Sequence, residues 1–375
     1  MKIDLTLSER TLTLHRFPKR ANETLQAWDA GDEYIINHVE EMALPDGQNI
    51  LILNDNFGAL SCWFSEKHSV YMVTDSFISQ KGTLKNLQRN QCNNVEFLNA
   101  MDALPAKIDL VLMQIPKNNR FLTWQLHQLN SQLNAECAVI AVNKAKEIHT
   151  STLKLFERFL GNTTTSLAWK KHRMVFAKPN KEIAEKVDPV TRWSANDGIQ
   201  LENLPNVYSG ETLDLGARFM LEHIPSDPEL KHILDLGCGN GVLSIKAAKL
   251  NPQAKITSVD ESFMAIESAA RNLSSNLESE VDFNCVANNC LDGFEAGTVD
   301  LVLCNPPFHQ QYAITDHIAW QMFCDAKHVL NTDGKLLVIG NRHLGYDVKL
   351  KRLFGKSQVV VVASNQKFVI LQATK

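Results

Sequence analysis

The feature that most constrains this chain is a glycine-rich turn. An apolar run that ends near Asp235 leads directly into Gly237, Gly239 and Gly241, and a helical pattern of apolar residues follows. This order predicts a buried parallel strand, a tight turn and then a helix. Glycines at alternate positions let the backbone approach a bound ligand closely, so the turn predicts a binding site.

The spacing of the turn separates two kinds of nucleotide ligand. Dinucleotides require G-x-G-x-x-G, but here the third glycine comes one residue early and Val242 stands where the fingerprint needs glycine. Asp235 at the strand end suits a ligand with an ammonium group and no phosphate. We therefore predict S-adenosylmethionine as the cofactor. A turn without a ligand is the alternative, although ordinary loops do not call for three glycines.

Length and composition limit the remaining possibilities. The chain has 375 residues, which suggests about two domains, and its net charge of -4 requires any nucleic acid to meet a local basic patch. We find no signal peptide, no apolar run of about 20 residues, no C-x-x-C pair and no H-E-x-x-H motif. We therefore expect a cytoplasmic protein with reduced thiols, no membrane span and no metal site.

A strand-and-helix rhythm occurs twice along the chain. Residues 49–61 align with residues 232–244 at a constant offset of 183, and residues 109–116 align with residues 300–307. Such self-similarity indicates an internal duplication of an α/β unit. The expected strands are residues 49–53, 70–74, 95–98, 108–113 and 137–142 in the first copy, and 232–237, 255–260, 281–286, 299–304, 335–339, 359–362 and 368–371 in the second.

The two copies differ where a cofactor would bind. Ile52 stands in the first copy where Asp235 stands in the second, and an apolar side chain cannot replace the strand-end acid. A polar stretch at residues 178–200 provides the linker. We predict two tandem, doubly wound, Rossmann-like α/β domains. Residues 1–180 form a degenerate RNA-binding or scaffold domain, and residues 181–375 form the catalytic domain.

Further cofactor contacts are expected after the next two strands. Asp260 ends the second strand and can accept hydrogen bonds from the ribose hydroxyls, and a helix N-cap is an alternative role that can coexist. Asn289 follows the third strand and can accept from the adenine amine through its carbonyl oxygen. A plain Asx turn explains Asn289 equally well.

The sharpest signal for chemistry is Asn305-Pro306-Pro307-Phe308, directly after the fourth strand. Two prolines hold the backbone extended and rigid. The Asn305 side chain and the Pro306 carbonyl can then accept both hydrogens of one amino group, which aims its lone pair at a sulfonium methyl. Phe308 offers a ring on which a flat base can stack, beside Pro307. A structural Pro-Pro turn is the alternative.

These motifs resemble class I S-adenosylmethionine-dependent methyltransferases that modify planar amino groups. Residues 207–218 are also similar to a segment that precedes the glycine turn in bacterial ribosomal RNA guanine-N2 methyltransferases and folds over the cofactor and base. That resemblance implies site roles for Asp214, Gly216 and Arg218. An amphipathic helix start explains each of them equally well.

A duplicated layout with a degenerate first half is shared by the small-subunit and large-subunit enzymes of that family. The large-subunit enzymes are the ones that this chain resembles most in three segments, residues 305–311, 341–344 and 149–171. The resemblance implies methylation of a guanine N2 amine in 23S ribosomal RNA, free or in a large-subunit assembly intermediate. The same chemistry on 16S guanine, on adenine N6 or on protein glutamine stays open. So does a non-catalytic RNA-binding or ribosome-assembly protein.

A folded RNA also needs cationic contacts. Residues 144–182 hold nine Lys and Arg residues against three Glu residues, and Trp169 stands beside the basic cluster. A solvated helix face would explain part of this charge. Arg342 lies near the end of the fifth strand, where it can line the mouth of the substrate site. We predict substrate contacts at Lys170, Lys171, Arg173, Arg342 and Pro307.

Overall fold

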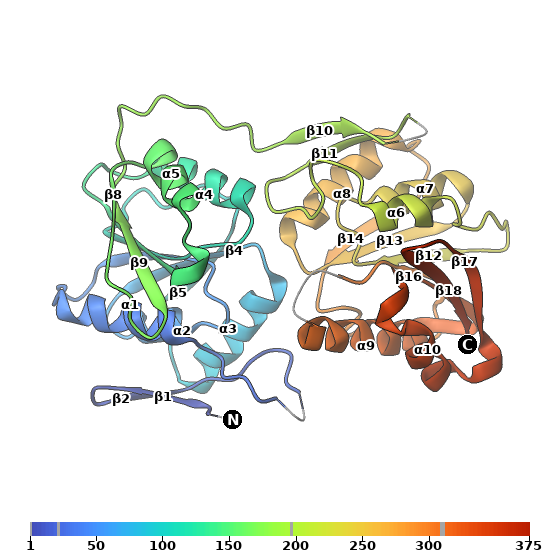
Figure 1. The fold of residues 1–375 in the computed structure, drawn as a ribbon, viewed down its shortest axis with the longest axis horizontal. Helices are drawn as coiled ribbons and strands as arrows, with labels where there is room; N and C mark the ends of the chain where they lie inside the picture. The colour runs from blue at the N-terminus through green and yellow to red at the C-terminus, as the bar shows by residue number, and fades with distance from the viewer. Residues whose placement is uncertain (1, 21–22, 196–197, 308–311) are drawn as a thin grey trace. The chain divides into compact units, whose positions relative to one another are not determined.

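The computed structural model describes residues 2–20, 23–195, 198–307 and 312–375. Two compact units divide the chain, Met1–Pro189 and Val190–Lys375 (Figure 1). The roles predicted for residues 1–180 and 181–375 stay predictions. Among the described helices, none combines the length and the apolarity that a membrane crossing requires.

The first unit contains a small hairpin and a seven-stranded sheet. The strands are β1 (Asp4–Leu7), β2 (Arg10–Thr13), β3 (Asn49–Leu53), β4 (Ser69–Thr74), β5 (Val95–Asn99), β6 (Leu110–Gln114), β7 (Ala138–Lys144), β8 (Thr163–Thr165) and β9 (His172–Ala177). The helices are α1 (Ala30–Glu41), α2 (Ala59–Phe64), α3 (Phe77–Arg89), α4 (Asn119–Gln132) and α5 (Thr150–Phe159), with a 3-10 turn η1 (Ala145–Glu147). The sheet order is β5-β4-β3-β6-β7-β9-β8.

Strand β3 shows why this sequence forms a central strand. Its run of Ile and Leu residues is buried, as expected for a parallel strand covered on both faces by helices. Ile50 and Ile52 pack into one core of the unit, and Leu51 and Leu53 pack into the other. The sheet therefore separates two hydrophobic layers.

The second unit contains the hairpin β10–β11 and another seven-stranded sheet. The strands are β10 (Thr191–Ser194), β11 (Gln200–Asn203), β12 (His232–Leu236), β13 (Lys255–Asp260), β14 (Phe283–Ala287), β15 (Val299–Cys304), β16 (Leu330–Asn341), β17 (Val359–Ser364) and β18 (Phe368–Thr374). The helices are α6 (Leu215–Leu221), α7 (Val242–Leu250), α8 (Phe263–Asn276), α9 (Tyr312–Val329) and α10 (Tyr346–Phe354), with 3-10 turns η3 (Arg342–Leu344) and η4 (Lys356–Gln358). The sheet order is β14-β13-β12-β15-β16-β18-β17.

The two sheets have the same strand order when β3 is matched with β12. This confirms the predicted fold of two tandem doubly wound domains and the predicted repeat. The last strand, β18, runs antiparallel to β16. Strands β8 and β9, which complete the first sheet, were missed by the sequence analysis.

Candidate functional site

The glycine turn after β12 has the backbone conformation that its sequence predicted. Gly237, Gly239 and Gly241 have φ values of 79°, 53° and 80°, in the region that favours glycine. A Cβ at Gly241 would lie 3.1 Å from the Cα of Ala269, so a side chain there would strain the packing of α7 against α8. A Cβ at Gly239 would meet nothing within 4 Å. The turn is therefore close-packed at its end and open at its centre.

Asp235 on β12 is fully buried, with 0% of its surface exposed. Its Oδ2 accepts hydrogen bonds from the Ser244 amide at 3.1 Å and the Ser244 hydroxyl at 2.7 Å. Its Oδ1 is buried and has no hydrogen-bond partner within the described part of the chain. Burial raises the pKa of Asp235 to about 7. An unpaired buried acceptor costs about 1–3 kcal/mol, and a ligand with a donor group would remove that cost.

Asp260 at the end of β13 connects the second strand to the glycine turn. Its two carboxylate oxygens accept from the amides of Gly239 at 2.9 Å and Ser262 at 3.0 Å. The helix cap that was an alternative role for Asp260 is made by Ser262, whose hydroxyl accepts from Ala265 at 3.1 Å. The Glu261 backbone amide also donates to Asp260, so three backbone donors hold this carboxylate at the turn.

Asn289 and Asp214 have partners within the protein. Asn289 is buried in the loop after β14, and its amide nitrogen donates to Asp292 at 3.0 Å. Asp214 caps α6 by accepting from the Ala217 amide at 2.9 Å. Partial burial and the Asp214 carboxylate raise the pKa of Tyr208 to about 12. The helix start that was an alternative role for Asp214 is thus present, and a contact with a cofactor stays a prediction for both residues.

Asn305 follows β15, which lies next to β12 in the sheet. Leu236 of β12 pairs with Cys304 of β15, so Gly237 and Asn305 come directly after paired positions. A Cβ placed on Gly237 would lie 3.8 Å from the Asn305 carbonyl oxygen. The Asn305 Oδ1 is also buried and unpaired within the described residues. Two unpaired acceptors, on Asp235 and Asn305, therefore lie on neighbouring strands at the carboxyl edge of the sheet, where α/β folds bind ligands.

The rest of the Asn-Pro-Pro-Phe motif is described only in part. Pro306 is buried and Pro307 is exposed. Phe308, predicted to stack on the base, lies outside the described residues. No group of three or more His, Cys, Asp or Glu residues in the described ranges is placed to hold a metal ion.

Three predicted RNA contacts gather at the β8–β9 hairpin of the first unit. Lys170 and Lys171 form its turn, with φ values of 43° and 65°. Lys170 donates to Glu33 at 2.7 Å and lies over the Trp169 ring at 4.3 Å. Lys171 is exposed, and the buried Nε of Arg173 has no partner among the described residues. One of the three cations is thus already paired within the protein.

Arg342 belongs to the second unit, in η3 directly after β16. Its guanidinium donates to the Asn365 carbonyl at 3.4 Å, a long and weak contact. Arg342 is exposed at the same edge of the sheet at which β12 and β15 end. The structure therefore places it one strand away from Asn305.

Two residues at this edge were not predicted as site residues. Ser244 holds the Asp235 carboxylate, and a signal for it was present, because Ser61 aligns with Ser244 in the repeat. Asn341, the last residue of β16, carries a buried Oδ1 without a partner in the described structure. Sequence reasoning noted Asn341 only as part of a motif for resemblance.

The doubly wound sheet, the glycine turn and the Asn-Pro-Pro corner define a class I methyltransferase. Residues 198–372 match the Methyltransferase small domain family, and residues 2–181 match the RLMG N-terminal domain family. The chain belongs to the ribosomal RNA large subunit methyltransferase G family, as the resemblance predicted. It is 69% identical to the member from Vibrio parahaemolyticus over 100% of this chain and 98% of that protein, and 68% identical to the Aliivibrio fischeri (strain MJ11) member over 100% and 99%.

A solved structure shares the tandem fold. The T. thermophilus 16S rRNA N2 methyltransferase, in complex with AdoMet and guanosine, aligns with a TM-score of 0.77 at 18% sequence identity. The alignment covers 99% of this chain and 97% of that chain. At this level of identity the likeness concerns the fold alone.

Proposed function

We propose that this protein transfers the methyl group of S-adenosylmethionine to the exocyclic N2 amine of a guanine in 23S ribosomal RNA. The observation that carries the proposal is a pair of buried oxygens, on Asp235 and Asn305, that have no partner among the described residues and lie on neighbouring strand ends beside the glycine turn. Family membership supports a large-subunit ribosomal RNA as the substrate. When bound, S-adenosylmethionine supplies a methyl group on a sulfonium centre.

The residues around the glycine turn fit the parts of this cofactor. The free Oδ1 of Asp235 accepts from the ammonium group, directly or through an ordered water. A cation at this position favours the ionised carboxylate, which burial alone disfavours. At Gly239, where a Cβ would meet nothing within 4 Å, the turn leaves room for the cofactor. Asp260 accepts from the ribose hydroxyls, and Asn289 accepts from the adenine amine.

The Asn-Pro-Pro corner binds and orients the target amine. The Asn305 Oδ1 and the Pro306 carbonyl accept its two hydrogens. This favours a pyramidal nitrogen and aims the lone pair at the methyl carbon, so the rate gain comes from positioning and electrostatics. Pro306 and Pro307 keep both acceptors fixed. No strong base is needed, because the methylated amine is a cation that loses its proton readily.

The first unit supplies RNA contacts rather than chemistry. The net positive charge of residues 144–182, nine Lys and Arg against three Glu, suits a phosphate backbone. Lys171 and Arg173 contribute directly, while Lys170 also holds the hairpin through Glu33. In the second unit Arg342 contacts RNA near the target base. The substrate is 23S RNA, free or within a large-subunit assembly intermediate.

The test uses ribosomal RNA from cells that lack this protein. Purified protein and isotopically labelled S-adenosylmethionine are incubated with that RNA, both free and in large-subunit particles from the same cells, and the labelled nucleotide is mapped by mass spectrometry. We expect one label, as N2-methylguanine, in 23S RNA. A label in 16S RNA or on adenine would overturn the substrate assignment, and no label on free RNA or on particles would overturn the enzymatic function.

A further inference from the structure

The carboxyl edge of the second sheet holds a third unpaired acceptor. Among the described residues of Val190–Lys375, the buried side-chain atoms without a hydrogen-bond partner are Oδ1 of Asp235, Oδ1 of Asn305 and Oδ1 of Asn341. The first two belong to the proposed site. The third is not used by the mechanism, although it lies on the neighbouring strand.

The register of β15 and β16 fixes how far Asn341 extends. The strands are parallel, and Cys304 pairs with Val338. Asn305 is thus one residue beyond this pair and Asn341 is three residues beyond it. At about 3.3 Å per residue, Asn341 reaches about 7 Å further past the edge than Asn305. Under the proposed function the target base lies beyond this edge, where α/β sheets bind their ligands.

The alternation of side chains brings the three acceptors to one face. Leu303 of β15 and Ile339 of β16 pack into the same hydrophobic core. Asn305 and Asn341 each follow two residues later, and the period of a strand is two. Asp235 likewise follows a residue of this core by two positions on β12. All three oxygens therefore belong to the face covered by α7.

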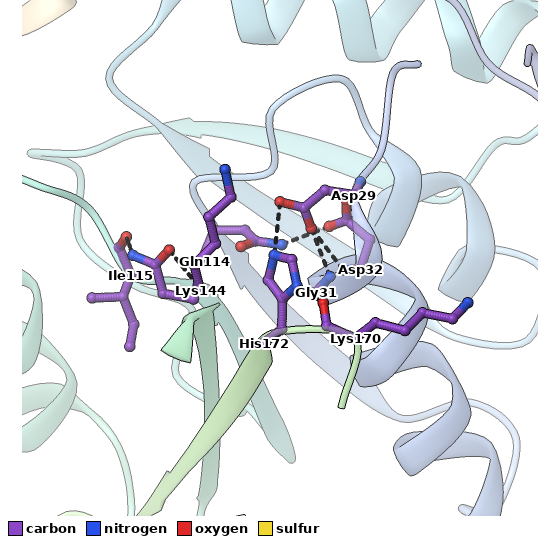
Figure 2. Close-up of polar contacts among 9 residues, drawn as sticks. Asp29, Gly31, Asp32, Gln114, Ile115, Lys144, Lys170 and His172 are labelled. Atoms are coloured by element: carbon purple, nitrogen blue, oxygen red, sulfur yellow. Dashed lines mark hydrogen bonds and ion pairs between the residues drawn. The ribbon is translucent and has the colours of Figure 1, made fainter. Parts of the chain in front are cut away.

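By strand register, Lys144 holds the position of Asn341 in the first unit, because Ala141 pairs with Met113 as Val338 pairs with Cys304. The asparagine of this strand end, Asn143, stands one residue earlier on β7 and has Ile115 and Lys144 as partners (Figure 2). Its amide nitrogen donates to the Ile115 carbonyl at 3.1 Å, and its Oδ1 accepts from the Lys144 amide at 2.7 Å. Ile115 aligns with Pro306 in the repeat. Both ends of the amide are thus used by the protein in the first unit, whereas the oxygen of Asn341 is not.

We propose that Asn341 determines base specificity by accepting a hydrogen bond from N1–H of the target guanine. This inference rests on the proposed function. On guanine, N1–H is the donor adjacent to the N2 amine, whose hydrogens are held by Asn305 and Pro306. On adenine, the ring nitrogen adjacent to the amine is an acceptor and would face another acceptor. An acceptor at this position therefore selects guanine and rejects adenine.

The test compares two RNA fragments that differ only at the target base. One carries guanine and the other carries 2-aminopurine, which has the same amine but no N1–H. We expect Asn341→Ala to lower the rate on guanine about 10- to 100-fold, because the base loses a partner. On 2-aminopurine the same substitution should change the already slower rate less than about threefold. Asn341→Asp, which keeps an acceptor, should retain the preference for guanine.

Calorimetry with S-adenosylmethionine provides the folding control, and the cofactor affinity of Asn341→Ala should equal that of the unaltered protein. Asn143→Ala removes an asparagine from the end of β7 in the first unit, one residue before the register position of Asn341, and should leave the guanine preference unchanged. Equal losses on both fragments, or no loss on guanine, would overturn the role of Asn341. If Asn341→Ala no longer binds cofactor, Asn341→Asp carries the test, and loss of its guanine preference would be the contrary result. Failure of the unaltered protein to methylate guanine both in the fragment and in large-subunit particles would instead refute the proposed function.

Discussion

The two units have one topology and two different sheet edges. In the second unit, Asn305 presents a buried oxygen that no described residue uses. In the first unit, Gln114 aligns with Asn305, and its amide donates to the buried Asp32 at 2.6 Å (Figure 2). The same sheet position is thus open to a ligand in one unit and closed by a neighbouring side chain in the other.

The glycine turn shows the same contrast. Asn54 aligns with Gly237, and its side chain exchanges two hydrogen bonds with Gln125, each of 3.0 Å. It also donates to the Gln114 carbonyl at 2.9 Å. The first unit therefore keeps its fold while its own amide groups occupy the edge. Under the proposed function, this internal pairing is the reason that we expect the first unit to bind no cofactor.

The buried acid also stands at different positions in the two units, on the strand in the second unit (Asp235) and in the turn in the first (Asp55). Asp55, in the turn, accepts from the amide and hydroxyl of Ser61, both at 2.8 Å, as Asp235 does from Ser244. The other oxygen of Asp55 accepts from Gly58 at 3.1 Å. Both oxygens of this acid are used by its own turn. The aligned residues Ser61 and Ser244 thus each hold an acid. In the first unit both oxygens of Asp55 are paired, whereas in the second unit only Oδ2 of Asp235 has a partner among the described residues.

The largest effect should come from the Asn305 and Gln114 pair. Asn305→Ala removes an acceptor that positions the amine, so we expect methyl transfer to fall at least about 100-fold. Cofactor affinity measured by calorimetry should not change. Gln114→Ala, the matched control, should leave the transfer rate unaltered. A similar loss in both variants would show that the two edges do not differ in function.

The second comparison concerns the two acids. Asp235→Asn removes the charge opposite the ammonium group, and we expect cofactor affinity to fall about 10- to 100-fold. Asp55→Asn should instead lower the free energy of unfolding by about 1–3 kcal/mol, because it disturbs a buried hydrogen-bonded turn. Calorimetric titration and denaturant unfolding of both variants separate these effects. If Asp55→Asn weakened cofactor binding as much as Asp235→Asn, the two acids would not have the different roles assigned to them.

A pH dependence should follow from Asp235, whose pKa is raised from 3.8 to about 7 by burial. Below pH 7 the carboxyl is protonated and cannot pair with the ammonium group. Cofactor affinity should therefore rise about tenfold from pH 6 to pH 8. The free energy of unfolding of the ligand-free protein should change in the opposite direction. Because the pKa of Asp235 is higher in the folded than in the unfolded protein, this free energy falls as the pH rises from about 4 to 7. Calorimetry across this range tests the prediction, and Asp235→Asn should show no such rise.

The smallest effects are expected within the hairpin of the first unit. Lys171 is exposed, so Lys171→Ala should weaken RNA binding about threefold to tenfold and reduce the salt slope by about 1. Lys170 already pairs with Glu33, so Lys170→Ala should have the smaller effect on affinity. Filter binding at several salt concentrations measures both. A larger effect at Lys170 would mean that its ion pair opens on RNA.

The sequence predicted the strands whose side chains are apolar, since buried parallel strands carry their signal locally. Strand β8 consists of three threonines, mostly exposed, and β9 follows a turn of two lysines. Their pairing is determined by β7, far away in sequence, so no local pattern reveals it.

For the candidate site, the sequence predicted the positions of the residues but not their hydrogen-bond partners. Asp235 and Asn305 could be placed near one another because neighbouring parallel strands end at one edge. Whether an oxygen is paired depends on side chains that only the folded chain brings together, such as Ser244 for Asp235. For that reason the unpaired oxygen of Asn341, a residue that the sequence offered only as part of a motif for resemblance, emerged only from the structure.

The central claim is that only the second unit retains an open cofactor edge. Equilibrium dialysis with labelled S-adenosylmethionine measures it directly, as the number of molecules bound per chain. We predict one bound molecule per chain, lost or strongly weakened in Asp235→Asn and unaffected by Gln114→Ala. Two bound molecules per chain, or one that binds Asp235→Asn with unchanged affinity, would contradict the account.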